Sequence, residues 1–423
     1  MTRPRAAIIV TGSELVRGVI ADRNGPFLAA ELVALGFHVG RIVIVGDRPE
    51  ELESALREGL DAALCVVSGG LGPTHDDRTI EMVARVTGRE LTIDTALETE
   101  IGRVSRSIAE RFGRPYSEFT AGVRKQASLP AGALSLGLAG TAPGVVVDTG
   151  SSAVVVLPGP PGELRRLWPR ALATDPLRRR LASVNPPRRR LLRFFGISES
   201  AVARALAAAG GDGDGVEATI CARDLEIEVD VAAAEGGEER AEWLAGALRT
   251  ELGGFLFSED RRPVEELVLA LCRARGLRLA TAESCTGGMV GARITSVPGA
   301  SDVYLGGVVS YSDDVKRSQL AVPEELLARH GAVSIEVAAA MAAGARACFG
   351  AEVAVAVTGV AGPGGGTPEK PVGLVELVAE GPAGQRRREL NLPGDRETIR
   401  ARATAAALHL VRELLSQDRN ERA

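Results

Sequence analysis

The feature that most constrains the fold of this chain is a regular alternation of short apolar runs, glycine-rich loops and segments with helical spacing. Apolar runs at 6–10, 39–45 and 64–67 each end in a turn, and a segment with helical apolar spacing follows each of them. Buried parallel strands with helices between them have this pattern. The pattern returns at 153–163 and from residue 277 onward. We therefore predict an α/β protein whose sheets are mainly parallel and covered by helices on both faces.

The 423 residues are too many for one ordinary hydrophobic core. We expect a three-layer α/β domain at 1–172, a small α+β domain at 173–257 and a second three-layer α/β domain at 258–423. The Asn-Pro-Pro sequence at 185–187 has the composition of a connector, and Pro263 precedes the first helix of the last domain.

The composition argues against several classes of protein. No apolar run approaches the roughly 20 residues that a membrane span needs. The net charge of −5 and the lack of a basic stripe give no reason to expect a nucleic-acid partner. The five cysteines are scattered and form no CxxC pair, so neither a disulfide framework nor a zinc knuckle is indicated. We expect a cytoplasmic enzyme that forms a homodimer.

Lysine is scarce in this chain. Lysine and arginine together number 50, yet lysine occurs only at Lys125, Lys316 and Lys370. A lysine can lose its proton when it is removed from water, whereas an arginine effectively cannot. We therefore treat the three lysines as candidates for tasks that need an amine, with chance survival as the alternative.

The segment ESCTGG at 283–288 follows an apolar strand and is expected to start a helix. Ser284 would stand at the turn, where the N–H groups of Cys285, Thr286 and Gly287 would be unpaired and directed at incoming negative charge. Such groups form an oxyanion hole. The simpler interpretation is a serine N-cap followed by glycines that allow close contact.

The segment YSDDVK at 311–316 places Tyr311 and Lys316 beside two aspartates. A lysine in water is almost wholly protonated at neutral pH, so Lys316 would need a closed apolar pocket to act as a general base. Asp313 and Asp314 would oppose the loss of the proton, so we expect them to point away. Tyr311 would relay a proton or hold the leaving group. The alternative for Lys316 is an ordinary surface ion pair with the aspartates.

Cys285 is a second candidate nucleophile, because helix N-termini favour the thiolate form of cysteine. A catalytic cysteine usually works with a histidine. The nearby histidines are His330 and His409, and His409 falls inside the terminal helix, where a packed histidine is expected. The residues therefore favour a Ser284–Lys316 pair over a Cys–His pair.

Five segments of the last domain together resemble the CinA family. They are TAESCTGG, YSDDVKR, HGAVS, VTGVAGPGGGTPEKPVG and PGDRETIR, at 281–288, 311–317, 330–334, 357–373 and 393–400. The C-terminal domain of that family is known as nicotinamide mononucleotide deamidase. The resemblance implies that Ser284, Tyr311 and Lys316 are catalytic. It also implies hydrolysis of the nicotinamide amide to nicotinate mononucleotide and ammonia, through an acyl-enzyme and without a cofactor.

The phosphate of that nucleotide would need backbone N–H groups or a cation. We expect the glycine-rich loop at Gly364 and Gly365, with Arg396 or Arg400, to hold it. Lys370 would order this loop or touch the substrate. Turn glycines and surface charges are the alternative interpretation of these residues.

Four segments of the first domain, TGSELVRG, SGGLGPTHDD, RKQASLP and GTAPG, resemble the molybdopterin-binding fold that the family also carries. In other members this domain is similar to an ADP-ribose pyrophosphatase that uses a divalent metal. A glycine-rich loop at the carboxyl end of a strand would itself cradle a phosphate through backbone N–H groups. We therefore expect a nucleotide site at Ser68, Gly69, Gly70, Gly72 and Lys125.

A metal at this site would take oxygen ligands from Glu14, Asp76 and Asp77, which suit Mg²⁺ or a similar ion. Helix capping is the alternative for the two aspartates. One departure from the family is Gly137, which stands where an asparagine is common before GTAPG and predicts weaker substrate binding.

Two functions from different classes are consistent with these residues. The first is a bifunctional pyridine-nucleotide salvage enzyme that deamidates nicotinamide mononucleotide and cleaves ADP-ribose. The second is a non-catalytic molybdopterin- or nucleotide-binding protein linked to competence or DNA damage. A binding protein would not need the Ser284–Lys316 pair, so the sequence favours the enzyme.

Overall fold

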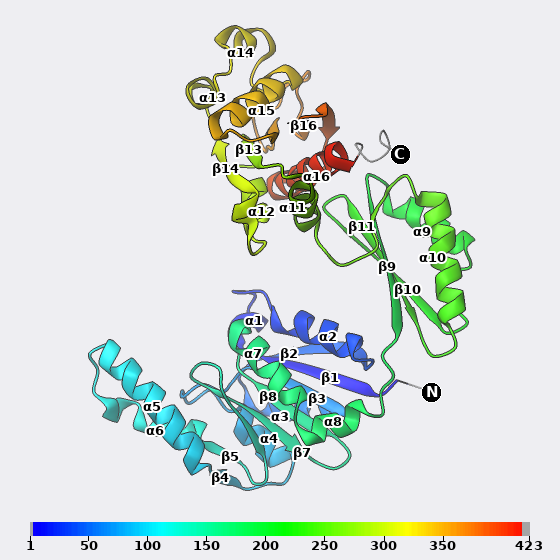
Figure 1. Ribbon diagram of the computed structural model, residues 1–423. Helices are drawn as coiled ribbons and strands as arrows, with labels where there is room; N and C mark the ends of the chain where they lie inside the picture. The colour runs from blue at the N-terminus through cyan, green and yellow to red at the C-terminus, as the bar shows by residue number, and fades with distance from the viewer. Residues whose placement is uncertain (1–2, 417–423) are drawn as a thin grey trace. The chain divides into compact units, whose positions relative to one another are not determined.

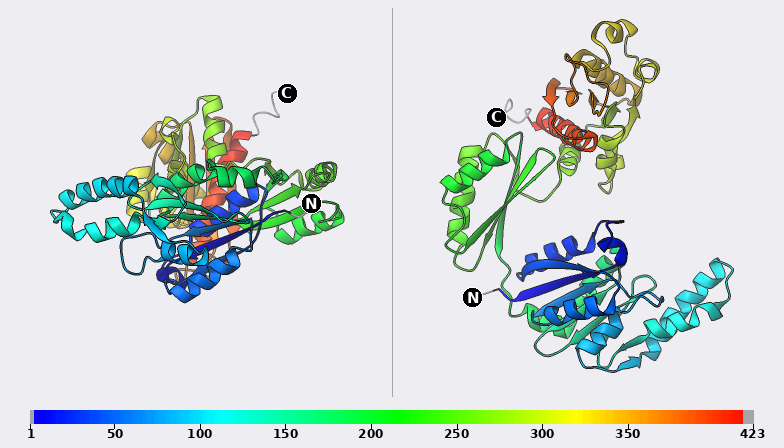
Figure 2. Two further views of the ribbon diagram at one scale, coloured as in Figure 1. Left: turned by 90° about the horizontal axis from the view of Figure 1, so that it is seen from below. Right: turned by 180° about the vertical axis from the view of Figure 1, so that it is seen from behind.

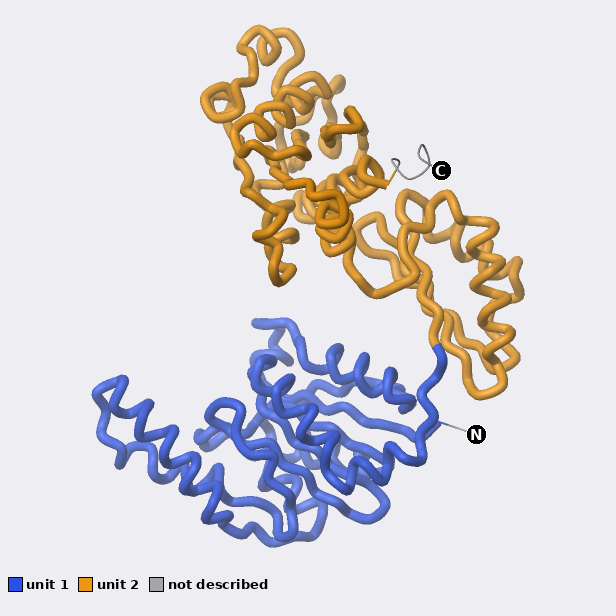
Figure 3. The backbone as a smooth tube through the Cα atoms, in the orientation of Figure 1, with its two compact units in different colours: residues 1–188 blue, residues 189–423 orange. Residues whose placement is uncertain are grey.

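A computed structural model describes residues 3–416 of the chain (Figure 1). The chain divides into two compact units, Met1–Arg188 and Arg189–Ala423, which Figure 3 colours separately. None of the helices in this described range is long and apolar enough to cross a membrane. Unit 2 contains two separate sheets, one in each of the two domains expected after residue 172.

Unit 1 is built on a six-stranded sheet. In sheet order its strands are β2 (His38–Val45), β1 (Arg5–Thr11), β3 (Leu64–Ser68), β8 (Ala153–Leu157), β7 (Pro143–Asp148) and β6 (Leu134–Leu138). The first four are parallel, β7 is antiparallel to β8, and β6 is antiparallel to β7. Every residue of β3 and β8 is buried, which explains their unbroken apolar sequences.

Helices cover both faces of this sheet. They are α1 (Ser13–Val16), α2 (Asn24–Ala34), α3 (Pro49–Gly59), α4 (Thr79–Val86), α5 (Thr95–Arg111), η1 (Tyr116–Glu118), α6 (Thr120–Gln126), α7 (Pro161–Leu172) and α8 (Asp175–Leu181). Two short strands, β4 (Leu91–Ile93) and β5 (Ser128–Pro130), pair beside them. Ile8 packs with residues of α2 and α7, whereas the next residue, Ile9, packs with residues of α3 and α4. The predicted three layers are therefore present.

The first sheet of unit 2 is small. In sheet order its strands are β10 (Val216–Arg223), β11 (Glu226–Ala233), β9 (Arg188–Phe195) and β12 (Leu256–Ser258). Strand β10 is antiparallel to β11, and β12 is antiparallel to β9. Two helices, α9 (Glu199–Ala208) and α10 (Glu238–Leu252), lie on one face of it (Figure 2). Leu192 and Phe194 of β9 face these helices in a common core. This is the expected small α+β arrangement.

The second sheet of unit 2 has five strands. In order they are β14 (Tyr304–Val309), β13 (Leu279–Glu283), β15 (Val353–Gly359), β16 (Leu374–Gly381) and β17 (Gly384–Asn391). The first three are parallel, and the last two continue the sheet as an antiparallel hairpin. The sheet is therefore mixed, and its parallel part contains the strands that precede the candidate catalytic residues.

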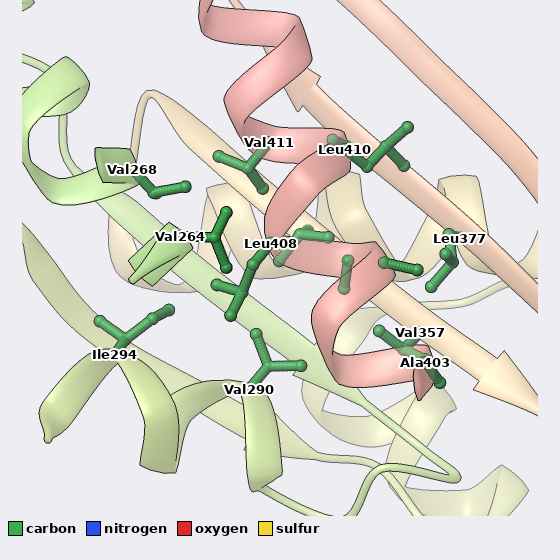
Figure 4. Close-up of a cluster of buried hydrophobic side chains, with 14 of the residues drawn as sticks. Val264, Val268, Val290, Ile294, Val357, Leu377, Ala403, Leu408, Leu410 and Val411 are labelled. Carbon is green, nitrogen blue, oxygen red and sulfur yellow. The ribbon is translucent and has the colours of Figure 1, made fainter. Parts of the chain in front are cut away.

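Helices also cover both faces of this sheet. One face carries α11 (Val264–Arg275), α12 (Met289–Thr295) and α16 (Arg396–Ser416), whose apolar side chains meet over the strands in Figure 4. The other carries α13 (Asp313–Leu320), α14 (Glu324–His330) and α15 (Ile335–Phe349). A short helix, η2 (Ala300–Asp302), precedes β14. The predicted α/β class is confirmed for this part of the chain too.

His409 joins the two sheets of unit 2. It is 0% exposed, as expected for a packed histidine, and stacks on Phe195 with ring centroids 3.8 Å apart. Phe257 meets the same ring edge-on at 4.6 Å. The His409 Nε2 atom lies 2.9 Å from Glu226 Oε1, and burial lowers the pKa of His409 to about 4. A neutral imidazole therefore holds α16 against β9, β11 and β12.

Candidate active site

The candidate nucleophile lies at the carboxyl end of the parallel strands of the five-stranded sheet. β13 runs between β14 and β15, and its last residue, Glu283, pairs with Val309 and Val357 of those neighbours. The Ser284 N–H donates to the Val357 carbonyl at 2.8 Å, and the Ser310 N–H donates to the Glu283 carbonyl at 2.8 Å. Ser284 therefore extends the central strand by one residue, with Ser310 beside it.

Side-chain alternation places Ser284 and Lys316 on the same side of the sheet. Ala280 and Ala282 of β13 lie in a core with Leu320 of α13, and strand residues two apart share a face. Lys316 stands one helical turn before Leu320, and both are buried on α13. Because α13 starts at the carboxyl end of β14, Lys316 lies nearer that end than Leu320. The fold thus brings the predicted nucleophile and base to one edge of one sheet.

Lys316 is only 1% exposed, so it is not an ordinary surface lysine, but the ion pair with an aspartate that was the alternative for it is present. Its Nζ atom lies 3.4 Å from Asp313 Oδ1. Asp314 instead pairs with Arg317. The expectation that both aspartates point away is therefore wrong for Asp313, because three-residue spacing in the first turn of α13 brings its carboxylate to the lysine.

The turn after Ser284 differs from the expectation. The helix α12 begins at Met289 rather than within ESCTGG, because Gly287 and Gly288 adopt left-handed φ angles of 61° and 94°. The Gly287 N–H donates to the Ser284 carbonyl at 3.1 Å. Gly287 was expected to offer a free N–H group to the substrate, and this part of the prediction is wrong because the turn itself uses that group.

The N-terminus of α12 is occupied by Glu283. This buried carboxylate accepts hydrogen bonds from the N–H groups of Gly288, Val290 and Gly291 at 2.9, 3.0 and 2.9 Å. A carboxylate at a helix N-terminus satisfies the free N–H groups and opposes the positive end of the dipole. The start of α12 therefore fixes the strand end before Ser284 and is closed to an incoming anion.

Cys285 is 5% exposed, and burial raises the pKa of its thiol to about 12. The N–H groups of Cys285 and Thr286 act in the opposite direction but do not outweigh burial. At neutral pH the sulfur therefore remains a thiol and a poor nucleophile. This favours Ser284 over Cys285, while the oxyanion role of the Cys285 and Thr286 N–H groups stays a prediction.

Two arginines of α16 reach the strand ends. Arg396 donates from Nη2 to the Tyr311 hydroxyl at 2.8 Å and from Nη1 to the Gly362 carbonyl at 2.7 Å. Arg400 donates to the Cys285 and Thr286 carbonyls at 3.0 and 2.8 Å. Arg400, expected as a phosphate ligand, thus holds the turn after Ser284.

Lys370 orders a neighbouring loop. Its Nζ atom donates to the carbonyl of His330 and, at 2.6 Å, to that of Val333. This was one of the two roles expected for Lys370. Gly364 and Gly365, by contrast, lie in an exposed part of the same long loop, so their contact with a phosphate remains a prediction.

The structure places side by side, in neighbouring strands, three polar residues that the sequence analysis did not single out. Thr358 is paired with Glu376, and Glu376 with Glu389, in successive strands β15, β16 and β17. Burial raises the pKa of the Glu376 carboxyl to about 7, and the Glu389 and Glu336 carboxylates add to this effect. A glutamate inside the apolar run of β16 was the available signal, but only the strand register shows its acidic partner.

In unit 1 the glycine-rich loop after β3 is built as a cradle. A Cβ atom on Gly69 would lie 2.4 Å from the Thr11 carbonyl oxygen, and one on Gly70 would lie 2.2 Å from Thr79 Oγ1, so both positions require glycine. Ser68 is buried and accepts a hydrogen bond from Asn24 at 2.9 Å. Its side chain therefore supports the loop from within.

Beside this loop lies a cavity of about 180 Å³ that is lined by Gly70, Gly72 and Lys125, but not by Ser68 or Gly69. The Lys125 ammonium donates to the Thr74 carbonyl and so also fixes the loop. Gly137 lies in β6 with a φ of 70°, a conformation that glycine and asparagine adopt more readily than other residues.

The expected metal ligands do not gather. Asp77 Oδ2 accepts a hydrogen bond from the Thr74 N–H at 3.0 Å and contacts the Thr74 hydroxyl, which makes it a cap of its own loop. Within residues 3–416 no three His, Cys, Asp or Glu side chains are arranged to hold a metal ion. Glu14, Asp76 and Asp77 therefore do not fit the predicted metal site in this arrangement.

Comparison with known proteins covers both units. Residues 261–415 match the model of the CinA C-terminal domain, and residues 7–177 match that of a probable molybdopterin binding domain. A CinA-like protein of Mycolicibacterium paratuberculosis is 46% identical over 97% of this chain and 98% of its own length, and one of Mycolicibacterium vanbaalenii is 45% identical over 97% and 99%.

Among solved structures, the competence/damage inducible protein CihA of Agrobacterium tumefaciens is 40% identical. The match covers 37% of this chain and 99% of that one, with a TM-score of 0.35. The full-length identity to the mycobacterial proteins and the two matched domains assign the chain to a family. The chain belongs to the CinA family.

Proposed function

We propose that the domain around Ser284 hydrolyses a carboxamide and that its substrate is nicotinamide mononucleotide. The observation that carries this proposal is the burial of Lys316 on the Ser284 side of the sheet edge. A buried lysine amine on the same side of the sheet as a serine can act as the base that accepts the proton of the serine hydroxyl. Membership of the CinA family supports the choice of substrate.

In this reaction the Ser284 Oγ atom attacks the amide carbon while its proton passes to the Lys316 amine. The bond from the carbonyl carbon to the amide nitrogen then breaks, and the proton held by Lys316 leaves with ammonia. A water molecule hydrolyses the resulting ester, and its proton restores the Ser284 hydroxyl through the same lysine. Arg396 and Tyr311 stand beside this edge and supply polar contacts for the rest of the substrate.

The test is ammonia release from nicotinamide mononucleotide by the purified full-length protein, with and without EDTA. We expect release in both conditions and none from Ser284→Ala. Ser296→Ala, which removes an exposed hydroxyl at the end of α12, is the matched control and should remain active. Release by Ser284→Ala at the wild-type rate, or loss of release in EDTA, would reject the mechanism.

For unit 1 we propose binding of a phosphate-bearing ligand such as ADP-ribose or a molybdopterin. The cavity between the glycine-rich loop and Lys125 supports this second role. We expect calorimetry to detect ADP-ribose binding that weakens in Lys125→Ala and is retained in Arg124→Ala. We derive no cleavage step, because the expected carboxylates are not gathered; release of AMP from ADP-ribose with Mg²⁺ would show that cleavage occurs.

A further inference from the structure

The hydroxyl of Ser310 is buried without a partner. Ser310 is 0% exposed, and its Oγ atom makes no hydrogen bond to any residue that the structure describes. Its backbone N–H donates to the Glu283 carbonyl. Buried hydroxyl groups in native proteins are nearly always paired, so an unpaired one is expected to serve a ligand, a water molecule or the chemistry of a site.

Ser310 lies beside the predicted nucleophile. Glu283 of β13 pairs with Val309 of β14, so the residues that follow them, Ser284 and Ser310, are neighbours across the two strands. Adjacent strands are about 4.8 Å apart. Val308 contacts the core that contains Ala282, so alternation directs the Ser310 side chain to the face on which Ser284 lies.

Lys316 lies on α13, which packs against the same face of the sheet. In the described part of the chain its Nζ atom has one hydrogen-bond partner, Asp313, at the long distance of 3.4 Å. A lysine amine therefore has capacity for a further contact. Tyr311, which the sequence suggested as the proton relay, is 61% exposed and its hydroxyl accepts from Arg396. The buried hydroxyl of Ser310, the residue before Tyr311, is better placed to relay the proton.

We propose that Ser310 relays the proton between Ser284 and Lys316, which rests on the deamidase function proposed above. As the Ser284 oxygen bonds to the amide carbon, its proton moves to Ser310 Oγ and the Ser310 proton moves to the Lys316 amine. The carbonyl oxygen takes the negative charge. When the carbon–nitrogen bond breaks, Lys316 returns its proton to Ser310 Oγ, and Ser310 gives its own hydroxyl proton to the departing nitrogen, which leaves as ammonia. Ser310 ends each step unchanged.

The experiment compares Ser310→Ala, Ser310→Thr and wild type in ammonia release from nicotinamide mononucleotide. Loss of a proton relay should lower kcat by about 10²–10³-fold in Ser310→Ala, with KM changed less than threefold. Ser310→Thr keeps the hydroxyl and should recover most of kcat. Thr281→Val is the matched control, because it removes a buried hydroxyl from the opposite face of β13, where Tyr304 is its partner. It should keep kcat within threefold of wild type.

A second measurement separates a relay from a packing role. In mixtures of H₂O and D₂O, wild-type kcat should vary along a curve, because two protons move together, whereas Ser310→Ala should give a straight line. The proposal is overturned if wild type gives a straight line, if Ser310→Ala keeps its kcat, or if Ser310→Thr is as slow as Ser310→Ala. If Ser310→Ala does not fold, Ser310→Gly replaces it, with the same expectations, because it also lacks a group that can carry the proton. Full activity of Ser284→Ala would instead reject the deamidase mechanism itself.

Discussion

The Arg396 guanidinium donates a hydrogen bond to the Tyr311 hydroxyl, with 2.8 Å between the atoms and 85 residues between them in the chain. Arg396 also bonds the Gly362 carbonyl. Tyr311 follows β14 and Gly362 follows β15, the two strands that flank β13. The arginine therefore spans the end of β13, where Ser284 stands. A planar fork can make both contacts at once, which an ammonium cannot reproduce in the same geometry.

Replacing Arg396 should weaken substrate binding more than it slows chemistry. We expect Arg396→Lys to raise KM for nicotinamide mononucleotide by about 10-fold, as expected for loss of one charge-assisted pair. Nicotinamide riboside lacks the phosphate. If the Arg396 guanidinium contacts the phosphate, Arg396→Lys should therefore change KM for nicotinamide riboside by less than twofold. Arg402→Lys, on the same helix and half-buried with its side chain bonded to the Pro393 carbonyl, is the control. Equal KM changes for both substrates would show that Arg396 acts only by holding the loop that contains Gly362.

The neighbouring cysteine should be dispensable. With a thiol pKa of about 12 and little exposure, Cys285 should not react with iodoacetamide at pH 8 in the folded protein. Cys285→Ser and Cys285→Ala should keep at least a third of wild-type kcat, whereas Ser284→Ala should lose it. Mass spectrometry of the alkylated protein and the ammonia assay check both statements. A folded but inactive Cys285→Ala, together with an active Ser284→Ala, would reverse the assignment.

Lys316→Arg should be as inactive as Lys316→Met. Arginine restores the positive charge but cannot give up its proton, and it is also too large for a position that is 1% exposed. Both variants should lose about 10³-fold or more in kcat, the range typical of a missing general base. Thermal unfolding identifies any loss that comes from misfolding. Substantial activity of Lys316→Arg would show that charge, not proton transfer, is what the site needs.

Glu376 should make the domain less stable as the pH rises. Its carboxyl has a pKa of about 7 in the folded chain and 4.5 as its ordinary value, so folding favours the protonated form. The free energy of unfolding should therefore fall between pH 4.5 and pH 7. Glu376→Gln should remove this fall, being more stable than wild type at pH 8 and similar near pH 4.5, as measured by urea unfolding.

Glu352→Gln provides a control of opposite sign. The hydrogen bond from Arg278 lowers the pKa of Glu352 to about 2, so the charged form is the one that folding favours. Its replacement should reduce stability throughout pH 4.5–8. A pH response of Glu376→Gln identical to wild type would mean that the Glu376 carboxyl does not cause the fall in stability.

Local patterns account for much of what the sequence could predict. The apolar run of β13 and the turn that follows it sufficed to place Ser284 at the end of a strand, whereas the helix α13 that carries Lys316 was not predicted. The role of Glu283 was not predictable, because whether a strand-end carboxylate turns back onto the next helix depends on the φ angles of Gly287 and Gly288. The Glu376–Glu389 pair was missed because it depends on strand register, and the Arg396–Tyr311 contact because it joins distant segments.

The sandwich of His409 between Phe195 and Phe257 bears on how this protein can be cut for study. A fragment beginning after residue 257 would retain Ser284, Lys316 and the whole five-stranded sheet but would lose both aromatic rings and Glu226. One side of α16 would then meet water where it is now covered. A boundary placed before β9, near residue 188, would keep the residues that cover α16 and is the sounder choice for expressing unit 2 alone.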